Sequence, residues 1–426
     1  MKNSVRISIA GLALVGCLSG SLLAQDFSTR DDPSVTPWRD PDNPMVILRD
    51  PNDPNAEFEF GRNSRPNPER EPGPIDLQRY DLNPFGSQFP TMFGLPIALN
   101  KEDLVAGDVD IALVGSTADN NAVPGTAYGP NILRGFIRTA GKQLVGSRGG
   151  GKMQRERSGV VDMYLHTYFH EVNVVDYGNI TVNPFEVGAT TEEIRRVINE
   201  IYAGGAKPAM FAGSHDGMYG MFLATADTYG RKNFGVVHFD SHYDAIRNGP
   251  FGAYAHNGNG ISNAIIYDVI DGKDIIQIGM TSFGPGNEDY EWLNSHGVRH
   301  HYAAEIERDG WEKVIERVLE ETRDMENILI MIDIDIMASN YVPGTGGREV
   351  DGITPREMAK MIRALTLQNN VLGIDVAEYN PMMDSRSFQT AEVVMFMLRN
   401  FIAAEAAKRR GITDPLYYDP KLVGDR

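Results

Sequence analysis

The sequence is poor in cysteine and in basic residues, and both deficits exclude classes of protein. One cysteine in 426 residues rules out a disulfide framework and a zinc module built from several cysteines. The 40 Lys and Arg residues are outnumbered by 58 Asp and Glu, which gives a formal net charge of −18. Such an excess of acid disfavours binding to nucleic acid or to an anionic membrane surface. After residue 25 no stretch approaches the ~18 apolar residues that a membrane span requires. We therefore expect no nucleic-acid partner and no membrane span.

The first 25 residues have the pattern of an export signal. Lys2 and Arg6 precede the apolar run 7–15, and small residues then lead to Ala24. This order predicts a signal peptide over residues 1–24 and a periplasmic or secreted mature protein. The segment 14–17 also resembles the signal of a bacterial lipoprotein, so a lipid anchor through Cys17 is the alternative.

Proline is concentrated in the segment that follows. Between Asp31 and Pro96 lie 13 of the 24 prolines. Proline lacks a backbone donor and biases the preceding residue away from helix, so no regular helix or sheet is expected there. We predict a Pro-rich extension over residues 25–104, which serves as an extended arm or as a contact between subunits.

From about Val105 the pattern indicates alternating strands and helices. Several short apolar runs lack polar alternation, as in parallel strands that are covered on both faces. The expected strands are 110–114, 172–175, 209–212, 234–239, 274–278, 298–302, 328–334 and 371–375. Thr190 with Glu193, and Thr354 with Glu357, predict two helix starts. We predict a three-layer α/β/α domain with a mainly parallel eight-stranded sheet over residues 105–410, followed by a tail over 411–426.

Carboxylates and imidazoles follow four of these strands, where ligands of an α/β sheet bind. The set is His215, Asp240, His242, Asp244, Asp333, Asp335 and Glu378. Residues two apart in a strand share a face, so Asp333 and Asp335 should project together. Burying them in an apolar strand is costly unless cations compensate their charge. Four carboxylates and two imidazoles suffice for two divalent ions, and these ligand types suit Mn²⁺, with Ni²⁺, Co²⁺ or Fe²⁺ as alternatives. Such a pair of ions activates water for attack on an electrophilic carbon.

Over roughly residues 105–407 the chain resembles the ureohydrolase family, which comprises arginase, agmatinase and related guanidino hydrolases. The resemblance rests on six motifs in the family's order. They are the opening strand and loop within 114–134, Gly-Ser-His-Asp around His215, Asp-Ser-His-Tyr-Asp at 240–244, Asp-Ile-Asp at 333–335, Val-Pro-Gly-Thr-Gly at 342–346, and Glu-Tyr-Asn-Pro at 378–381.

The resemblance implies a dinuclear hydrolase that converts the guanidinium group of a small cationic, agmatine-like compound to urea and an amine. It implies six metal ligands: His215, Asp240, His242, Asp244, Asp333 and Asp335. Asp240 and one of Asp333 or Asp335 would bridge the two ions, which are Mn²⁺ or, as the alternative, Ni²⁺. A homo-oligomer, either a trimer or a hexamer, is also implied.

Three residues receive catalytic roles from the same resemblance. Asp244 would pass a proton to the departing amine, and His256 would shuttle protons. Glu378 would pair with the substrate guanidinium through a planar, bidentate contact. His238 precedes Asp240 by two residues, and we interpret it as a core histidine or as a support for a metal ligand.

Two departures from the family pattern keep other functions open. Ser214 stands where the family has an Asp before its metal-binding His, and the region around His256 carries one extra residue. These changes motivate a formimino or amidine hydrolase that releases no urea. An alternative of another class is a non-catalytic envelope protein that binds metal or polyamine. The substrate tail cannot be assigned from these motifs.

Overall fold

The computed structural model describes residues 70–77, 90–119, 123–140, 161–182, 187–247, 256–281 and 286–424. Its centre is a single sheet of eight parallel strands. The strands are β1 (Ile111–Ser116), β2 (Val174–Ile180), β3 (Lys207–Phe211), β4 (Gly235–Phe239), β5 (Ile275–Ile278), β6 (Arg299–His301), β7 (Ile328–Asp333) and β8 (Val371–Ala377). Each expected strand is present, but β2 extends to Ile180 rather than ending at 175, whereas the other bounds differ by two residues or fewer. Every pair of neighbours is parallel, so the α/β prediction is confirmed and the sheet is more uniform than expected.

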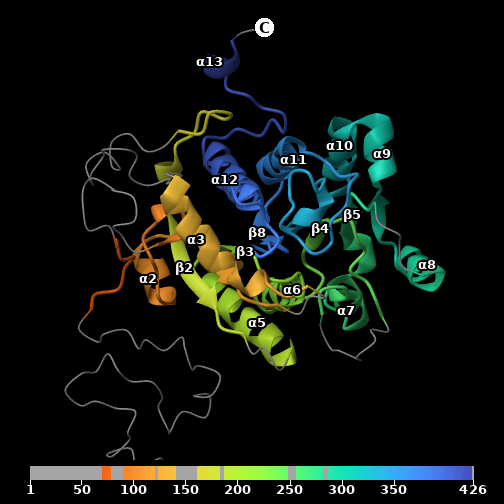
Figure 1. Cartoon of the computed structure of the whole chain (residues 1–426), viewed down its shortest axis with the longest axis horizontal. Helices are drawn as coiled ribbons and strands as arrows, with labels where there is room; N and C mark the ends of the chain where they lie inside the picture. Colours follow the sequence, from red (N-terminus) through yellow and green to blue (C-terminus); the bar gives the residue numbers. More distant parts are fainter. Residues whose placement is uncertain are drawn as a thin grey trace, which may run out of the picture. The chain divides into compact units, whose positions relative to one another are not determined.

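Helices cover both faces of the sheet (Figure 1). They are α2 (Lys101–Ala106), α3 (Gly129–Ala140), α5 (Val187–Ala203), α6 (Gly217–Tyr229), α7 (Gly260–Ile266), α8 (Asn287–Ser295), α9 (Ala303–Asp309), α10 (Trp311–Glu321), α11 (Pro355–Gln368), α12 (Gln389–Arg409) and α13 (Pro420–Val423). One apolar cluster joins α3, α10, α11 and α12 to the sheet, and another joins α5, α6 and α7 to its opposite face. This gives the three layers that the sequence predicts.

The continuous apolar runs form strands because both faces of the sheet are covered. Every residue of β7 and of β8 is buried. Successive side chains enter opposite layers, as the period of two requires: Ile330 packs in the cluster with α11 and α12, whereas Met331 packs in the cluster with α5 and α6.

The two predicted helix starts have different outcomes. At α11, Thr354 accepts a hydrogen bond from the Glu357 backbone N–H at 3.2 Å, and the Glu357 carboxylate accepts one from the Thr354 N–H at 2.7 Å, so that capping box is confirmed. At α5, the start predicted at Thr190 is wrong, because the helix already begins at Val187. A capping pattern of two residues does not exclude an earlier start when the preceding residues also accept helical geometry.

The strand order brings the predicted chemistry to the middle of the sheet. The order is β2-β1-β3-β8-β7-β4-β5-β6, so the four strands followed by metal-ligand candidates or Glu378 are neighbours at its centre. The chain first places β2 on one side of β1 and then β3 on the other side. It next forms β4, and β8 and β7 later fill the two positions between β3 and β4. The carboxyl ends of strands around such a reversal form the usual ligand crevice.

Several predictions concern residues outside the described part. The signal peptide, Cys17 and most of the Pro-rich extension lie there. Met92 and Phe93, from the end of the predicted extension, are buried in the core of the compact unit Pro72–Arg426. The domain boundaries near residues 104 and 410 stay predictions. Among the described residues no helix has the length and apolarity to cross a membrane.

Candidate metal centre

The six predicted ligand residues converge at the carboxyl ends of β3, β4 and β7. His215 lies in the loop between β3 and α6, and segment 240–244 directly follows β4. Asp333 is the last residue of β7, whereas Asp335 lies in a 3₁₀ turn, Ile334–Ile336. The expectation that both project from one strand is therefore wrong. They still point together because the Asp333 carboxylate accepts a hydrogen bond from the Asp335 backbone N–H at 2.9 Å.

One group of ligands surrounds the Nδ1 atom of His215. This nitrogen lies 2.9 Å from Asp244 Oδ2, 3.2 Å from Asp240 Oδ2 and 3.6 Å from Asp333 Oδ2. The His215 side chain is 1% exposed, so these contacts are made without water around the ring. The arrangement is one imidazole nitrogen facing three carboxylates.

A second group shares Asp240 with the first. His242 Nδ1 lies 3.0 Å from Asp335 Oδ2 and 3.3 Å from Asp240 Oδ1. Asp240 therefore presents Oδ2 to the His215 group and Oδ1 to the His242 group. The spacing needed to hold a metal ion is found in two sets of side chains, which are His215, His238, Asp240 and Asp244, and Asp240, His242 and Asp335. Asp240 lies where a bridging ligand of two ions would stand, whereas His242 is 39% exposed and marks the open side of the centre.

Strained backbone holds the loops that carry this centre. Ala212, Asp244 and Glu378 have φ values of 57°, 45° and 69°, in the left-handed region that non-glycine residues rarely adopt. The Glu378 carboxylate accepts a hydrogen bond from the His215 N–H at 2.7 Å, and the Glu378 N–H donates to the Gly213 carbonyl at 2.8 Å. These bonds join the β3 and β8 loops. Strain maintained at several positions of one site is typical of functional geometry.

The donor set fits divalent cations. Among the described residues, His215 Nδ1, Asp240 Oδ2 and Asp244 Oδ2 are buried and make no hydrogen bond of normal geometry. Burial together with the neighbouring Asp335 raises the pKa of Asp333 well above its ordinary value. Burial and Asp240 likewise raise the pKa of Asp335 to about 6. Converging carboxylates that resist ionisation are stabilised when cations bind between them.

The pKa values of the two imidazoles also reflect the excess of carboxylates around them. Burial lowers the pKa of His215, but Asp240 and Asp244 outweigh it, and the pKa rises well above its ordinary value. Burial also opposes protonation of His242, yet Asp240 and Asp335 raise its pKa to about 12. The carboxylates thus favour a proton on each ring, in the place that a cation would take.

Several groups fix the ligands of the second group. Ser241 donates to Asp335 Oδ1 from its backbone N–H at 3.2 Å and from its hydroxyl at 2.7 Å. The His242 N–H donates to Asp240 Oδ1 at 2.6 Å. Gly347 closes over the same ligands, since a Cβ there would lie 2.4 Å from Asp335 Oδ2 and 2.8 Å from His242 Cε1. The loop after β7 therefore needs glycine at this position.

His238 lies directly beside the centre, as the interpretation of a supporting histidine requires. It is fully buried in β4, and its Nε2 lies 3.1 Å from Asp240 Oδ2. Its ring stacks on His215 with centroids 5.1 Å apart, and Gln277 Nε2 lies 3.0 Å from its Nδ1. Its position two residues before Asp240, on the same strand face, is the signal that indicates this contact.

Two further buried carboxylates lie near the centre, and the sequence motifs assign no role to them. Ser214 donates its hydroxyl to the carboxylate of Asp216, which is 1% exposed. A buried carboxylate therefore contacts the Ser214 side chain. Asp375, inside β8, is completely buried, and burial raises its pKa to about 7. A lone Asp in an otherwise apolar strand is the sequence signal for it, by the reasoning already applied to Asp333 and Asp335.

His256, the predicted proton shuttle, makes only local hydrogen bonds within the described chain. Its N–H donates to Asn259 Oδ1 at 2.9 Å, and its Nδ1 accepts from the Gly258 N–H at 3.0 Å. Residues 248–255, which precede it, lie outside the described part. The described contacts do not join His256 to the six ligands, and its role stays a prediction.

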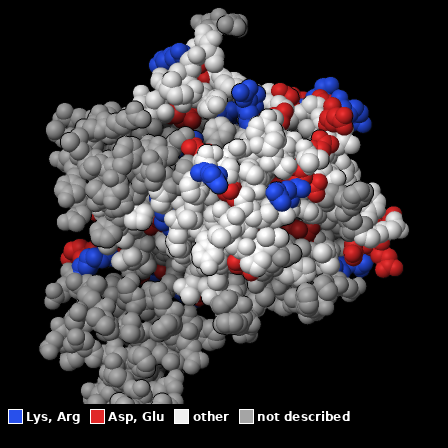
Figure 2. Space-filling view, in the orientation of Figure 1, with Lys and Arg blue, Asp and Glu red and all other residues white. Residues whose placement is uncertain are grey.

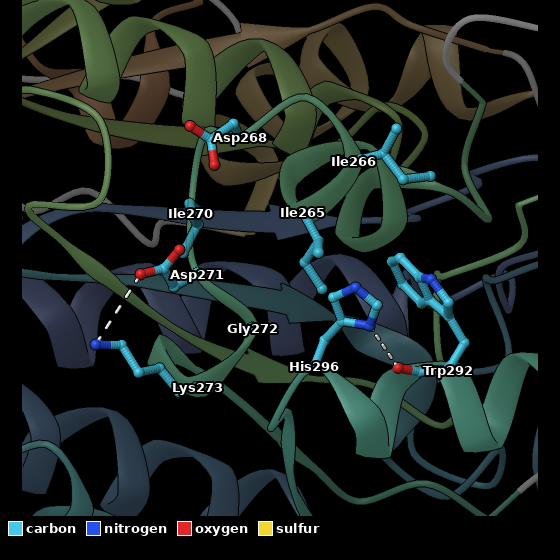
Figure 3. Close-up of a pocket in the computed structure, with 9 residues that line it drawn as sticks. All are labelled: Ile265, Ile266, Asp268, Ile270, Asp271, Gly272, Lys273, Trp292 and His296. Atoms are coloured by element: carbon cyan, nitrogen blue, oxygen red, sulfur yellow. Dashed lines mark hydrogen bonds and ion pairs between the residues drawn. The ribbon is translucent and has the colours of Figure 1, made fainter.

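A surface pocket lies at the other end of the sheet. Asp268, Asp271, Ile266, Trp292 and His296 are among its lining residues (Figure 3). Figure 3 shows the Asp271–Lys273 ion pair at one side and the His296 ring beside Trp292 at the other. The segment 265–273 precedes β5, so this pocket is at the amino end of the strands and contributes nothing to the ligand groups.

Figure 2 shows how charge is distributed on one face of the described part. On the face in Figure 2, acidic and basic side chains are interspersed over the described part, and no continuous acidic area covers it. The concentration of carboxylates that matters chemically is the buried one, at the ends of β4 and β7.

Known proteins resemble this chain in sequence and in fold. The model of the arginase family matches residues 109–403. The chain is 27% identical over 299 residues to a mitochondrial agmatinase of Gallus gallus, covering 69% of this chain and 79% of that protein. It is 22% identical over 229 residues to formimidoylglutamase of Staphylococcus haemolyticus, covering 54% of this chain and 71% of that protein.

The structural likeness extends over almost the whole of a solved relative. Proclavaminate amidino hydrolase from Streptomyces clavuligerus superposes with a TM-score of 0.63 at 22% identity. The match covers 76% of this chain and 99% of that one. At this identity the match establishes the fold, and the chemistry depends on the residues described above.

Proposed function

The chain belongs to the arginase family, and we propose that it hydrolyses the guanidinium group of a small, agmatine-like cation to urea and an amine. The observation that carries this proposal is the pair of His–Asp groups that share Asp240. It is supported by relatives in the family that act on C–N bonds, among them an agmatinase.

The reaction would take place at a dinuclear centre, and we propose Mn²⁺ with Ni²⁺ as the alternative. His215, Asp244 and Asp333 would hold one ion, His242 and Asp335 the other, with Asp240 between them. Divalent ions held by these residues would lower the pKa of a bound water molecule towards neutrality and so would supply the nucleophile. Oxygen and imidazole ligands without thiolate favour Mn²⁺ over structural zinc.

Glu378 is the residue we assign to the substrate guanidinium. It is 5% exposed at the edge of the centre, and burial raises its pKa to about 8. A bound guanidinium would stabilise the ionised carboxylate and orient its planar group by paired hydrogen bonds. The carboxylate already accepts the His215 N–H, so substrate position and ligand position are coupled. Asp244 would then hold the proton that passes to the departing amine.

The test uses the full chain, loaded separately with Mn²⁺ and with Ni²⁺, on agmatine, arginine, guanidinobutyrate and guanidine. We expect urea from agmatine, and its loss in Asp335→Asn. Asp274→Asn is the matched control, because Asp274 also lies in a 3₁₀ turn but precedes β5 at the opposite end of the sheet. Urea release by metal-loaded Asp335→Asn at the rate of the control would show that the assigned centre is wrong.

A formimino hydrolase is the second candidate, and the likeness to a formimidoylglutamase is the observation that favours it. The same centre would attack a formimino carbon and yield formamide with an amine, without urea. Identification of the product with a guanidino and a formimino substrate separates the two reactions. Stoichiometric binding of metal without any product would instead favour the non-catalytic alternative.

Export, and assembly into a trimer or hexamer, complete the proposal. The supporting pattern for export lies in residues 1–24, outside the described part. Cell fractionation with mass spectrometry of the mature N-terminus tests cleavage after Ala24 against lipidation of Cys17, and light scattering measures the oligomeric state.

A further inference from the structure

Asp375 is a buried carboxylate for which packing offers no explanation. It lies in the middle of β8, where every other residue is apolar. Its exposed fraction is 0%, and neither carboxylate oxygen makes a hydrogen bond of normal geometry with a described residue. Burial of such a group costs free energy unless it is compensated, so a carboxylate in this position points to a partner.

Asp375 lies on the sheet face of His238, on which the His215 ring stacks. Asp375 is the register partner of Met210 in β3 and of Met331 in β7, and Met331 is the register partner of His238 in β4. Paired residues of neighbouring strands share a face, so Asp375 and His238 lie on the same side of the sheet. The His215 ring stacks on His238 at this side.

The charge of His215 also acts on Asp375. Burial raises the pKa of Asp375 to about 7, and His215 is the strongest of the neighbours that oppose this rise. Asp216 acts in the opposite direction, as a second carboxylate near the first. The Asp216 carboxylate already accepts the Ser214 hydroxyl, so Asp375 is the one of the two that offers unoccupied acceptor oxygens.

The two nitrogens of His215 face different groups. Nδ1 points at Asp240, Asp244 and Asp333. Nε2, across the ring, is buried and makes no hydrogen bond of normal geometry within the described chain. An imidazole that binds a cation through Nδ1 carries its proton on Nε2, and this N–H requires an acceptor.

We propose that Asp375 is the positioning residue of His215 and accepts the Nε2–H of its imidazole when Nδ1 holds a divalent ion. This inference rests on the proposed function, because it assigns His215 to the ion pair. A carboxylate behind a ligating imidazole fixes its tautomer and orientation and increases its basicity. Asp375 thereby completes a chain from β8 through His215 to the cation.

The proposal predicts opposite effects on stability and on metal binding. In the metal-free protein Asp375 is a burden, so its replacement by a neutral side chain should leave stability unchanged or increase it. In the metal-loaded protein the replacement removes the support of one ligand. A residue with only a structural role would instead destabilise the metal-free fold when replaced.

The experiment compares the full chain with Asp375→Asn and Asp375→Ala. Met210→Leu is the matched control, since Met210 is the register partner of Asp375 in the neighbouring strand and is buried on the same face of the sheet. Urea unfolding in the presence of chelator measures the stability of the metal-free proteins. Competition between protein and chelator for Mn²⁺ gives the two dissociation constants. Nitrogen-15 spectra of the Zn²⁺-loaded proteins report the Nε2–H of His215, assigned by its loss in His215→Asn.

We expect Asp375→Ala to weaken one of the two Mn²⁺ ions by about 10- to 100-fold, with the other nearly unchanged. Asp375→Asn should be less affected, because its amide oxygen still accepts the N–H. The Nε2–H signal should be shifted in Asp375→Asn and exchange faster with water in Asp375→Ala. Met210→Leu should resemble the wild type in all three measurements.

Three outcomes would overturn the proposal. They are two unchanged dissociation constants in a folded Asp375→Ala, equal weakening of both ions, and loss of metal-free stability in both Asp375 variants. Failure of the wild type to bind two ions would refute the proposed dinuclear function itself. The inference and the function on which it rests therefore fail in different ways.

Discussion

One methyl group added at Gly347 should disable the second metal-ligand group while leaving the fold intact. Gly347 lies in the loop after β7, over the side chains of Asp335 and His242. A Cβ in this position would approach Asp335 Oδ2 to 2.4 Å and His242 Cε1 to 2.8 Å. The φ of Gly347 lies outside the left-handed region, so the substitution Gly347→Ala adds volume without backbone strain.

The size of the effect follows from these distances. An ordinary contact of a Cβ begins near 3.4 Å, so Asp335 or the loop must move by about 1 Å. A displacement of about 1 Å in a catalytic group lowers the rate by roughly 100-fold. This corresponds to about 2.7 kcal/mol of lost transition-state stabilisation. We expect a reduction of this size in kcat/KM and weaker binding of one Mn²⁺.

The adjacent glycine provides the control. A Cβ at Gly346 would meet only Val123 Cβ, at 3.8 Å, which is an ordinary contact. Steady-state kinetics and Mn²⁺ titration of Gly346→Ala should match the wild type, and both variants should unfold at the same urea concentration in the metal-free state. Wild-type kcat/KM and metal binding in Gly347→Ala would refute the placement of this loop over Asp335.

Three further predictions concern stability, measured by urea unfolding of the metal-free protein. Arg134→Met should lower the free energy of unfolding by about 3–5 kcal/mol, because the buried Asp176 would lose its cation. The Asp176 side chain is 2% exposed and is bound by two Arg134 nitrogens at 2.7 Å. A loss of stability as small as that of a surface ion pair would contradict the buried pairing. Thr354→Ala should cost about 1 kcal/mol, since the capping box with Glu357 opens α11, whereas an unchanged midpoint would argue against that cap. Burial raises the pKa of Asp375 to about 7, against ~3.9 in the unfolded chain, so the folded state binds this proton more tightly and the stability that the proton contributes is lost as pH rises. Between pH 4 and 8 the free energy of unfolding of the wild type should fall by about 4 kcal/mol more than that of Asp375→Asn. Parallel pH profiles of the two proteins would contradict this assignment.

The local pattern of the sequence predicts most of the fold because neighbouring residues carry the relevant information. Continuous apolar runs identify all eight strands, and the pair Thr354 and Glu357 identifies the start of α11. The helix start at Thr190 is the failure of this kind. Helix ends depend on which residues the surrounding structure allows to continue the helix, and the capping pattern alone does not contain that information.

The candidate site shows the same division. The residue types and their order identify all six ligand candidates, because buried carboxylates and imidazoles at strand ends have few uses besides binding cations. Their conformations depend on contacts distant in sequence. Asp335 leaves the strand for a 3₁₀ turn, held through its carboxylate by Ser241, which is 94 residues away.

The sequence by itself determined the strands, the α/β class and the six residues that meet at the centre, since each follows from local periodicity or from the chemistry of residue types. Only the tertiary structure decided that β3, β8, β7 and β4 are neighbours, that Asp240 is shared by both groups, and that Asp375 lies on the same sheet face as His238. The reason is physical. Strand order and side-chain partners are set by the burial of the whole sheet between two helical layers, and no short segment of the chain specifies that packing.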